Sequence, residues 1–79
     1  MRILFFARTQ DLAGCDSIDW ETGEAQSEEA LWHWLGGRFP ALAALKSSTR
    51  LGRNGAWLER GGFLNPNDEV AVLPPVSGG

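Results

Sequence analysis

The most apolar segments of the chain lie at its two ends. Residues 3–7 are Ile-Leu-Phe-Phe-Ala, and residues 69–73 are Glu-Val-Ala-Val-Leu. A short continuous apolar run is typical of a strand in the middle of a sheet, with both faces covered by the protein or by a partner. If both runs are central strands, we expect them to be parallel neighbours.

One main helix is predicted between these strands. Ser27 is a suitable N-cap, and Glu28–Glu29 place carboxylates in the first turn, where they interact favourably with the helix dipole. Gly36–Gly37 is expected to weaken or end this helix. Pro40 can begin a second short helical turn. The predicted apolar stripe of the main helix consists of Ala30, Leu31, Trp34 and Leu35.

The other segments carry strand and turn signals. Thr9–Asp16 is predicted to be a loop, and the alternating residues of Ser17–Glu21 predict a half-buried strand that forms a hairpin with the first strand. Asn54-Gly55 predicts a type I′ hairpin turn, which needs a positive φ at both positions. Asn65–Asp68 predicts a turn before the last strand. The segments joined by the hairpin turn are Thr49–Arg53 and Ala56–Leu58.

This order of elements predicts an α+β fold of the β-grasp type, in which one main helix packs on one face of a mixed sheet. A length of 79 residues predicts a single domain, 1–79. Its C-terminal tail, 74–79, would leave from the middle of the sheet and project freely. Residues 73–76, Leu-Pro-Pro-Val, form a stiff base, because proline fixes its own φ and restricts the residue before it.

Composition disfavours several classes of function. The net charge is −3 and no basic block is present, so a nucleic-acid partner is not expected. The single cysteine, Cys15, supports neither a disulfide framework nor a zinc cluster, and it is interpreted as an incidental loop residue. Neither a signal peptide nor a membrane span is visible, so we expect a cytoplasmic protein without a membrane partner. Trp32 and His33 lie off the apolar stripe, where Trp32 is expected to pack against a loop and His33 to be solvated.

Three segments carry a resemblance to a known family: MRILFFAR at the start, NG between two strands, and NDEVAVLPPVSGG at the end. Together with the length, they make the chain similar to the MoaD/ThiS family of ubiquitin-like sulfur carriers, and most similar to its MoaD branch. The resemblance spans the chain, and DEVAVLPPVSGG is its most specific part. Asn65–Asp68 departs from the family's usual Asp-Gly-Asp turn, and Gly36–Gly37 interrupts the helix, but neither touches the tail.

The resemblance implies that the chain carries sulfur on the C-terminal carboxylate of Gly79. An E1-like enzyme would adenylate this carboxylate with ATP, and sulfur from a persulfide donor would replace AMP to leave a thiocarboxylate. The tail would then enter the large subunit of molybdopterin synthase, in an expected heterotetramer, and pass its sulfur to a cyclic pterin monophosphate precursor. Gly78 and Gly79 suit this task, because residues without a Cβ can thread a narrow channel. The chain itself would bind no cofactor and no metal.

The resemblance also implies a docking surface. Alternation along the first strand puts Phe5 and Phe6 on opposite faces of the sheet, and one helix can cover only one face. An apolar patch of Phe6, Trp57 and Leu73 is expected on the open face, for both the activating enzyme and the large subunit. The alternative is that these three are ordinary core residues. The residues expected to contact partners are Phe6, Trp57, Leu73, Pro74, Pro75, Val76 and Ser77, and Arg8, Arg50, Arg53 and Arg60 are either rim contacts or ordinary surface residues.

Other functions stay open at this point. A related carrier could serve thiamine thiazole, cysteine or tRNA thiolation, although thiazole carriers usually lack the double proline. The same activated carboxylate could form isopeptide bonds with lysines, as in a ubiquitin-like protein modifier. A plain binding module with an idle tail predicts that removing Ser77–Gly79 changes nothing.

Overall fold

The computed structural model describes residues 1–74, so the predictions for Pro75, Val76, Ser77, Gly78 and Gly79 lie outside the described residues. In chain order the elements are β1 (Arg2–Phe5), α1 (Arg8–Ala13), β2 (Ser17–Asp19), β3 (Gln26–Ser27), α2 (Glu28–Arg38), α3 (Pro40–Ala43), a 3₁₀ turn (Lys46–Ser48), β4 (Arg50–Arg53), β5 (Ala56–Trp57), β6 (Phe63–Leu64) and β7 (Glu69–Leu73).

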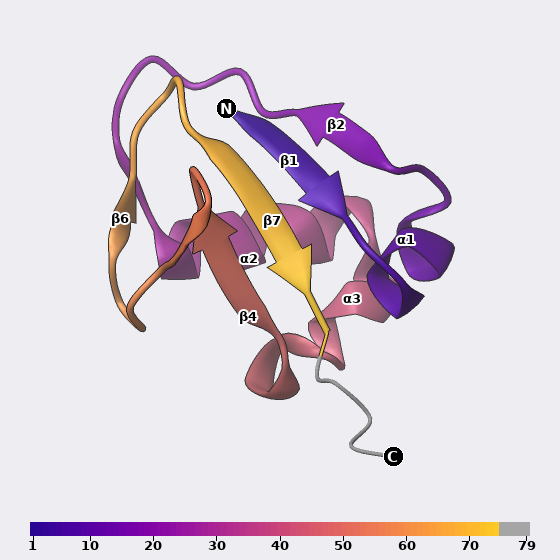
Figure 1. Cartoon of the computed structure of the whole chain (residues 1–79). Coiled ribbons are helices and arrows are strands. Elements are labelled where there is room, and N and C mark those ends of the chain that lie inside the picture. Colours follow the sequence, from indigo (N-terminus) through magenta and orange to yellow (C-terminus); the bar gives the residue numbers. More distant parts are fainter. Residues whose placement is uncertain (75–79) are drawn as a thin grey trace.

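The two apolar ends of the chain form the centre of a mixed sheet, as the sequence predicts. Within residues 1–74 the main sheet has the strand order β2-β1-β7-β4-β5. Figure 1 shows β2, β1, β7 and β4 in this order. β1 and β7 are parallel, with Ile3 opposite Val70. β1 pairs antiparallel with β2, which confirms the predicted pairing, and β7 pairs antiparallel with β4. Because β7 is flanked on both sides, the last strand ends in the interior of the sheet.

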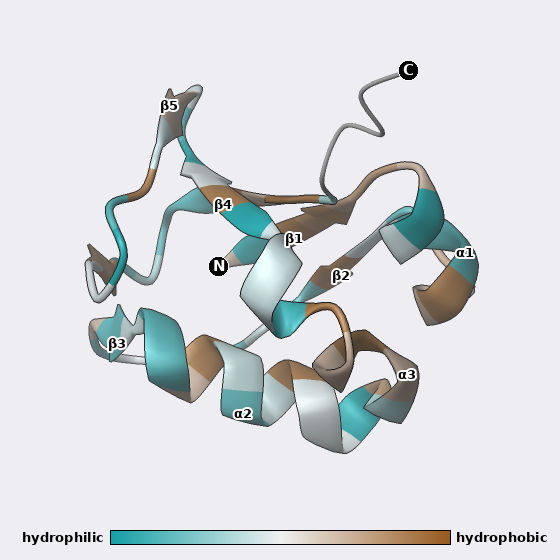
Figure 2. Cartoon of the chain, turned by 90° about the horizontal axis from the view of Figure 1, so that it is seen from below, coloured by the Kyte–Doolittle hydropathy of each residue, from teal (hydrophilic) through white to brown (hydrophobic). Residues whose placement is uncertain are grey.

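The helices α2 and α3 form a layer against one face of this sheet (Figure 2). Ile3, Phe5, Val70 and Val72 are at most 2% exposed and belong to the hydrophobic core with residues of both helices. Side chains alternate along a strand, so the residues between them lie on the opposite face. The helices therefore leave one face of the sheet uncovered within the described part of the chain.

The main helix begins where the sequence predicts and continues further than predicted. The hydroxyl oxygen of Ser27 accepts a hydrogen bond from the Ala30 amide at 3.0 Å, which confirms the N-cap. The prediction allowed that Gly36–Gly37 ends the helix, and this part of it is wrong, because α2 runs to Arg38. Each glycine costs about 1 kcal/mol in a helix. Packing of the fully buried Leu35 in the core outweighs that cost.

Trp32 belongs to the core and not to the margin of the helix. It is only 4% exposed, so its placement off the apolar stripe is wrong, whereas its expected packing is confirmed. Two segments from later in the chain, at Lys46 and at Gly61, fold against the first turn of α2 and cover this side. The Gly61 amide donates a hydrogen bond to the Glu28 carboxylate at 2.7 Å, and Lys46 forms an ion pair with Glu29. The helix is therefore buried on a wider arc than a single stripe.

The segment predicted as the loop Thr9–Asp16 is helical up to Ala13, as part of the helix α1. Leu12 packs against the hydrophobic core, and Gly14 ends the helix in the left-handed conformation with a φ of 74°. The prediction failed because a helix of six residues is shorter than the window of about 11–18 residues in which amphipathic periodicity is recognised. Its one usable signal was a glycine directly after two apolar residues.

The hairpin turn between β4 and β5 is confirmed. Asn54 and Gly55 have φ values of 50° and 84°, as a type I′ turn requires. The pairing of β3 with β6 was not predicted. Each of these strands has only two residues, and its pairing partner is far away in the sequence. No local pattern therefore predicts this pairing.

Candidate functional site

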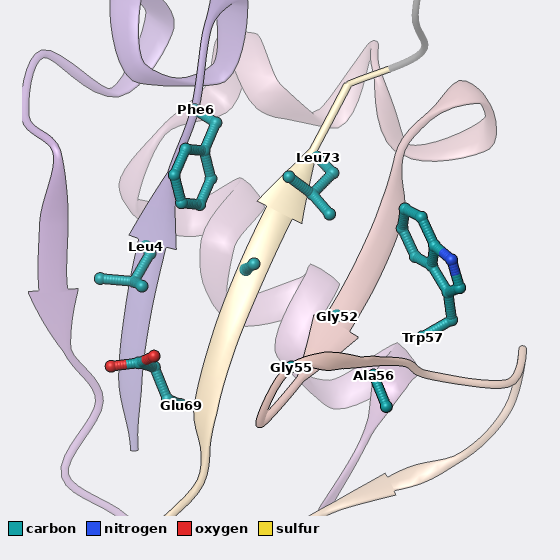
Figure 3. Close-up of a pocket in the computed structure, with 9 residues that line it drawn as sticks. Leu4, Phe6, Gly52, Gly55, Ala56, Trp57, Glu69 and Leu73 are labelled. Carbon is teal, nitrogen blue, oxygen red and sulfur yellow. The ribbon is translucent and has the colours of Figure 1, made fainter.

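The open face of the main sheet carries a hollow with a volume of about 400 Å³. Figure 3 shows its lining side chains, which come from β1, β7 and the β4–β5 hairpin. The lining residues are Leu4, Phe6, Gly52, Gly55, Ala56, Trp57, Glu69, Ala71 and Leu73. Most of this lining is apolar, so the hollow favours an apolar group over a charged one.

Small residues make this face concave. Gly52 in β4 lies opposite Ala71 in β7 on one side and opposite Trp57 in β5 on the other. Neither Gly52 nor Ala71 fills the space above the sheet. Larger side chains at the neighbouring positions form walls around this floor.

The structure brings together the three residues predicted to form an apolar patch. Phe6 and Trp57 are 43% and 58% exposed, and Leu73 is partly buried. In Figure 3, Leu73 lies between the other two at the end of β7. Large apolar side chains left open together usually mark an interaction surface. We call Phe6, Leu73 and Trp57, with the hollow that they line, the docking surface. That this surface contacts partners stays a prediction. The same holds for a partner contact of Pro74, which is partly exposed.

A tight turn positions Phe6 at one end of this surface. The Thr9 hydroxyl oxygen accepts from the Phe6 amide at 3.0 Å, and the hydroxyl lies 2.7 Å from the Phe6 carbonyl oxygen and 3.1 Å from that of Val72. This fully buried hydroxyl therefore ties the end of β1 to the end of β7. Ala7 in the same turn has a φ of 51°, which is strained for a residue with a Cβ.

A cation–π contact positions Trp57 at the other end. The guanidinium carbon of Arg50 lies 4.2 Å from the centroid of the Trp57 ring. Arg50 begins β4 and is paired with Leu73 in the sheet register. Paired residues on neighbouring strands share a face. Arg50 therefore belongs to the docking surface. From the sequence alone, Arg50 was one of four arginines that could be either rim contacts or ordinary surface residues.

A buried carboxylate fixes the turns behind the hollow. Burial by itself raises the pKa of Asp68, but hydrogen bonds from the Asn65 amide and the Asn54 side chain, with the nearby Arg53 guanidinium, outweigh it and hold this pKa below its ordinary value of 3.8. Asp68 thus remains ionised in the folded protein near neutral pH. It holds the β4–β5 turn close to the start of β7.

The described residues show a surface suited to binding. In residues 1–74, no group of three or more His, Cys, Asp or Glu residues could hold a metal ion. No helix in this part of the chain is long and apolar enough to cross a membrane. His33 is exposed on α2, and Cys15 is partly buried against the core. Neither residue belongs to the docking surface.

Comparison with solved structures defines the class of the fold. SAMP1 from Haloferax volcanii superposes with a TM-score of 0.83 at 26% identity, covering 100% of this chain and 98% of that one. A putative molybdopterin converting factor subunit 1 from Pyrococcus furiosus has a TM-score of 0.81 at 24% identity, with 95% of each chain covered, and supports the fold. The protein is an α+β, ubiquitin-like β-grasp protein.

Sequence comparison defines the family. The ThiS family model matches residues 3–79, so the chain belongs to the ThiS family. Molybdopterin synthase sulfur carrier subunits from Aedes aegypti and Haemophilus influenzae are each 33% identical to it, over 100% of this chain and 88% and 99% of theirs. The human protein of the same name is 29% identical over 100% of this chain and 93% of its own.

Proposed function

We propose that this chain is the sulfur-carrier small subunit of a molybdopterin synthase. The observation that carries the proposal is its similarity over the whole chain to sulfur carrier subunits of that enzyme. The family match includes the terminal residue, Gly79, where the chemistry would take place. The chain would act with partner proteins in the cytoplasm and would hold no cofactor of its own.

The proposed chemistry uses the carboxylate of Gly79. An E1-like enzyme joins it to AMP from ATP and releases pyrophosphate. The terminal sulfur of a persulfide donor then displaces AMP, and a thiol reduces the resulting acyl disulfide to leave a thiocarboxylate. In the large subunit this sulfur passes to a cyclic pterin monophosphate precursor, and water supplies the oxygen that restores the carboxylate.

The position of β7 supports this proposal. Leu73 is both the last residue of the central strand and a wall of the hollow. A partner that covers the hollow is therefore placed beside the start of residues 74–79. Proline lacks the amide hydrogen that a sheet ladder needs, so Pro74-Pro75 does not favour continued pairing. In this proposal the docking surface supplies affinity, and the tail supplies the reacting group.

The decisive experiment maps sulfur to Gly79. The protein is expressed with its E1-like enzyme and sulfur donor, labelled with a thiol-specific reagent, and its C-terminal peptide is sequenced by mass spectrometry. We expect the label on Gly79 and sulfur transfer when the large subunit and precursor are added. A variant lacking only Gly79 is the control and should fold normally but transfer no sulfur. An unlabelled Gly79, or full activity of the shortened variant, would overturn the proposal.

Protein modification is the second candidate function. The observation that favours it is the likeness to SAMP1, and a further solved relative, from Methanosarcina acetivorans, carries the name small archaeal modifier protein 1, at 27% identity and a TM-score of 0.78. Modification would join the activated Gly79 carboxylate to lysine amines. Denaturing electrophoresis of cells that express a tagged chain would show higher-mass adducts if this occurs. Their absence under activating conditions would argue against it.

A further inference from the structure

Arg50 is a cation within the apolar docking surface, and its charge is not neutralised by another described residue. Within residues 1–74 the ion pairs are Lys46–Glu29 and Arg53–Asp68, and neither includes Arg50. The contact that holds its guanidinium is the face of the Trp57 ring, at 4.2 Å. Arg50 is exposed, so water satisfies its donors in the free protein.

Docking changes this environment. Arg50 lies next to Leu73 in the sheet register and over Trp57, so a partner that covers these two residues also covers the guanidinium. An aromatic face compensates only part of the lost hydration of a cation. A guanidinium that loses water without gaining an acceptor weakens the complex strongly. The partner must therefore supply an acceptor at this position.

The geometry favours a carboxylate as that acceptor. The guanidinium carbon lies over the Trp57 ring, 4.2 Å from its centroid. A guanidinium carries five N–H donors, and a carboxylate can accept two of them at once. The overall charge of the chain is −3, so the chain as a whole attracts acidic partner groups less than basic ones. Glu69 lines the hollow and adds a negative charge there. Among the described residues that form the docking surface, Arg50 is the cation, so this surface can accept an acidic group there.

We propose that the partner docking on this surface presents a carboxylate to Arg50, and that Arg50 is a specificity-determining residue for this partner. The inference rests on the proposed function, because it takes the large subunit of molybdopterin synthase as the docked protein. Arg50 has two roles in this arrangement. It holds the Trp57 ring in place, and it orients the partner through a charge pair.

The test compares the affinity of four variants for the large subunit encoded in the same genome, measured by calorimetry at several salt concentrations. Arg50→Met keeps the aliphatic stem and should weaken binding about tenfold or more. Arg50→Glu should weaken binding further. Arg50→Lys keeps the charge and should lose less affinity than Arg50→Met. Arg38→Met is the matched control, because Arg38 lies 5.3 Å from the centroid of the Trp34 ring on α2, in the layer on the other face of the sheet.

The salt dependence separates the charge pair from a purely structural role. Affinity of the wild type should fall as salt rises, and this dependence should be smaller in Arg50→Met and unchanged in Arg38→Met. A loss that is equal at all salt concentrations would overturn the inference, as would wild-type affinity in Arg50→Met. If the wild type itself fails to bind the large subunit, the proposed function is contradicted, and the inference falls with it.

Discussion

The side-chain amide of Asn54 donates a hydrogen bond to the carboxylate of Asp68 at 2.9 Å and so links two turns that are far apart in the sequence. The same side chain accepts a hydrogen bond from the Glu69 amide at 2.9 Å. The carboxylate of Asp68 also accepts from the Asn65 amide at 2.7 Å. This network fixes the β4–β5 hairpin, which carries Trp57, against the start of β7. The shape of the hollow therefore depends on polar contacts behind it.

Replacement of Asn54 by glycine should destabilise the fold. Glycine tolerates the positive φ at this position, so the variant isolates the loss of the side-chain hydrogen bonds. Leaving a buried carboxylate with one partner fewer should reduce the free energy of unfolding by about 1–3 kcal/mol. Urea denaturation measures this change. The control is Asn67→Gly at an exposed position of the neighbouring turn, and equal effects of the two variants would contradict the role of Asn54.

Stability should fall in acid because of Asp68. Its pKa in the folded protein lies below the ordinary value of 3.8, so the folded state binds fewer protons than the unfolded state around that pH. The contribution of this group is present in full above pH 3.8 and is lost as the pH falls through the lower, folded pKa. Urea denaturation between neutral pH and acid should show a smaller decrease for Asp68→Asn than for the wild type. A decrease of the same size in both proteins would show that another group is responsible.

Replacement of Ala7 by glycine should stabilise the protein. Ala7 has a φ of 51° and a ψ of −126°, a conformation that glycine adopts without steric cost. Relief of this strain should exceed the entropy cost of glycine and raise the free energy of unfolding by up to about 1 kcal/mol. The comparison is Ala41→Gly in α3, where the same change should destabilise a helix by about 0.5–1 kcal/mol. Thermal denaturation of both variants shows whether each change raises or lowers the stability of the fold. A loss of stability in Ala7→Gly would refute the assignment of strain.

Trp57→Ala should weaken binding to the large subunit without unfolding the protein. Tryptophan is among the residues that most often contribute 2 kcal/mol or more to an interface, so we expect a loss of affinity of roughly 30-fold. Because Trp57 is 58% exposed and its removal costs the fold one cation–π contact, the free energy of unfolding should change by less than about 1 kcal/mol. The control is Phe63→Ala, which removes an aromatic residue of similar exposure, 63%, that does not line the hollow. If both variants bind alike, the docking surface lies elsewhere.

Local patterns predicted the elements whose signals lie close together in the chain. The continuous apolar character of β1 and β7 predicted that both lie at the centre of the sheet, and Asn54-Gly55 specified its turn, because turn chemistry acts over four residues. The cap at Ser27 was equally local. α1 was missed, because six residues are fewer than two helical turns and do not repeat the pattern often enough to be recognised. The two-residue strands β3 and β6 were missed for a similar reason.

The sequence by itself determined the strand order at the centre, the start of the main helix and the tail residues that resemble a sulfur carrier. Only the tertiary structure decided that Gly36–Gly37 remain helical, that Trp32 is buried, and that Arg50 stands over Trp57 beside Leu73. The physical reason is that burial and side-chain contact depend on segments that arrive from distant parts of the chain. A local pattern records the preference of one segment, whereas packing between segments settles which preferences are kept.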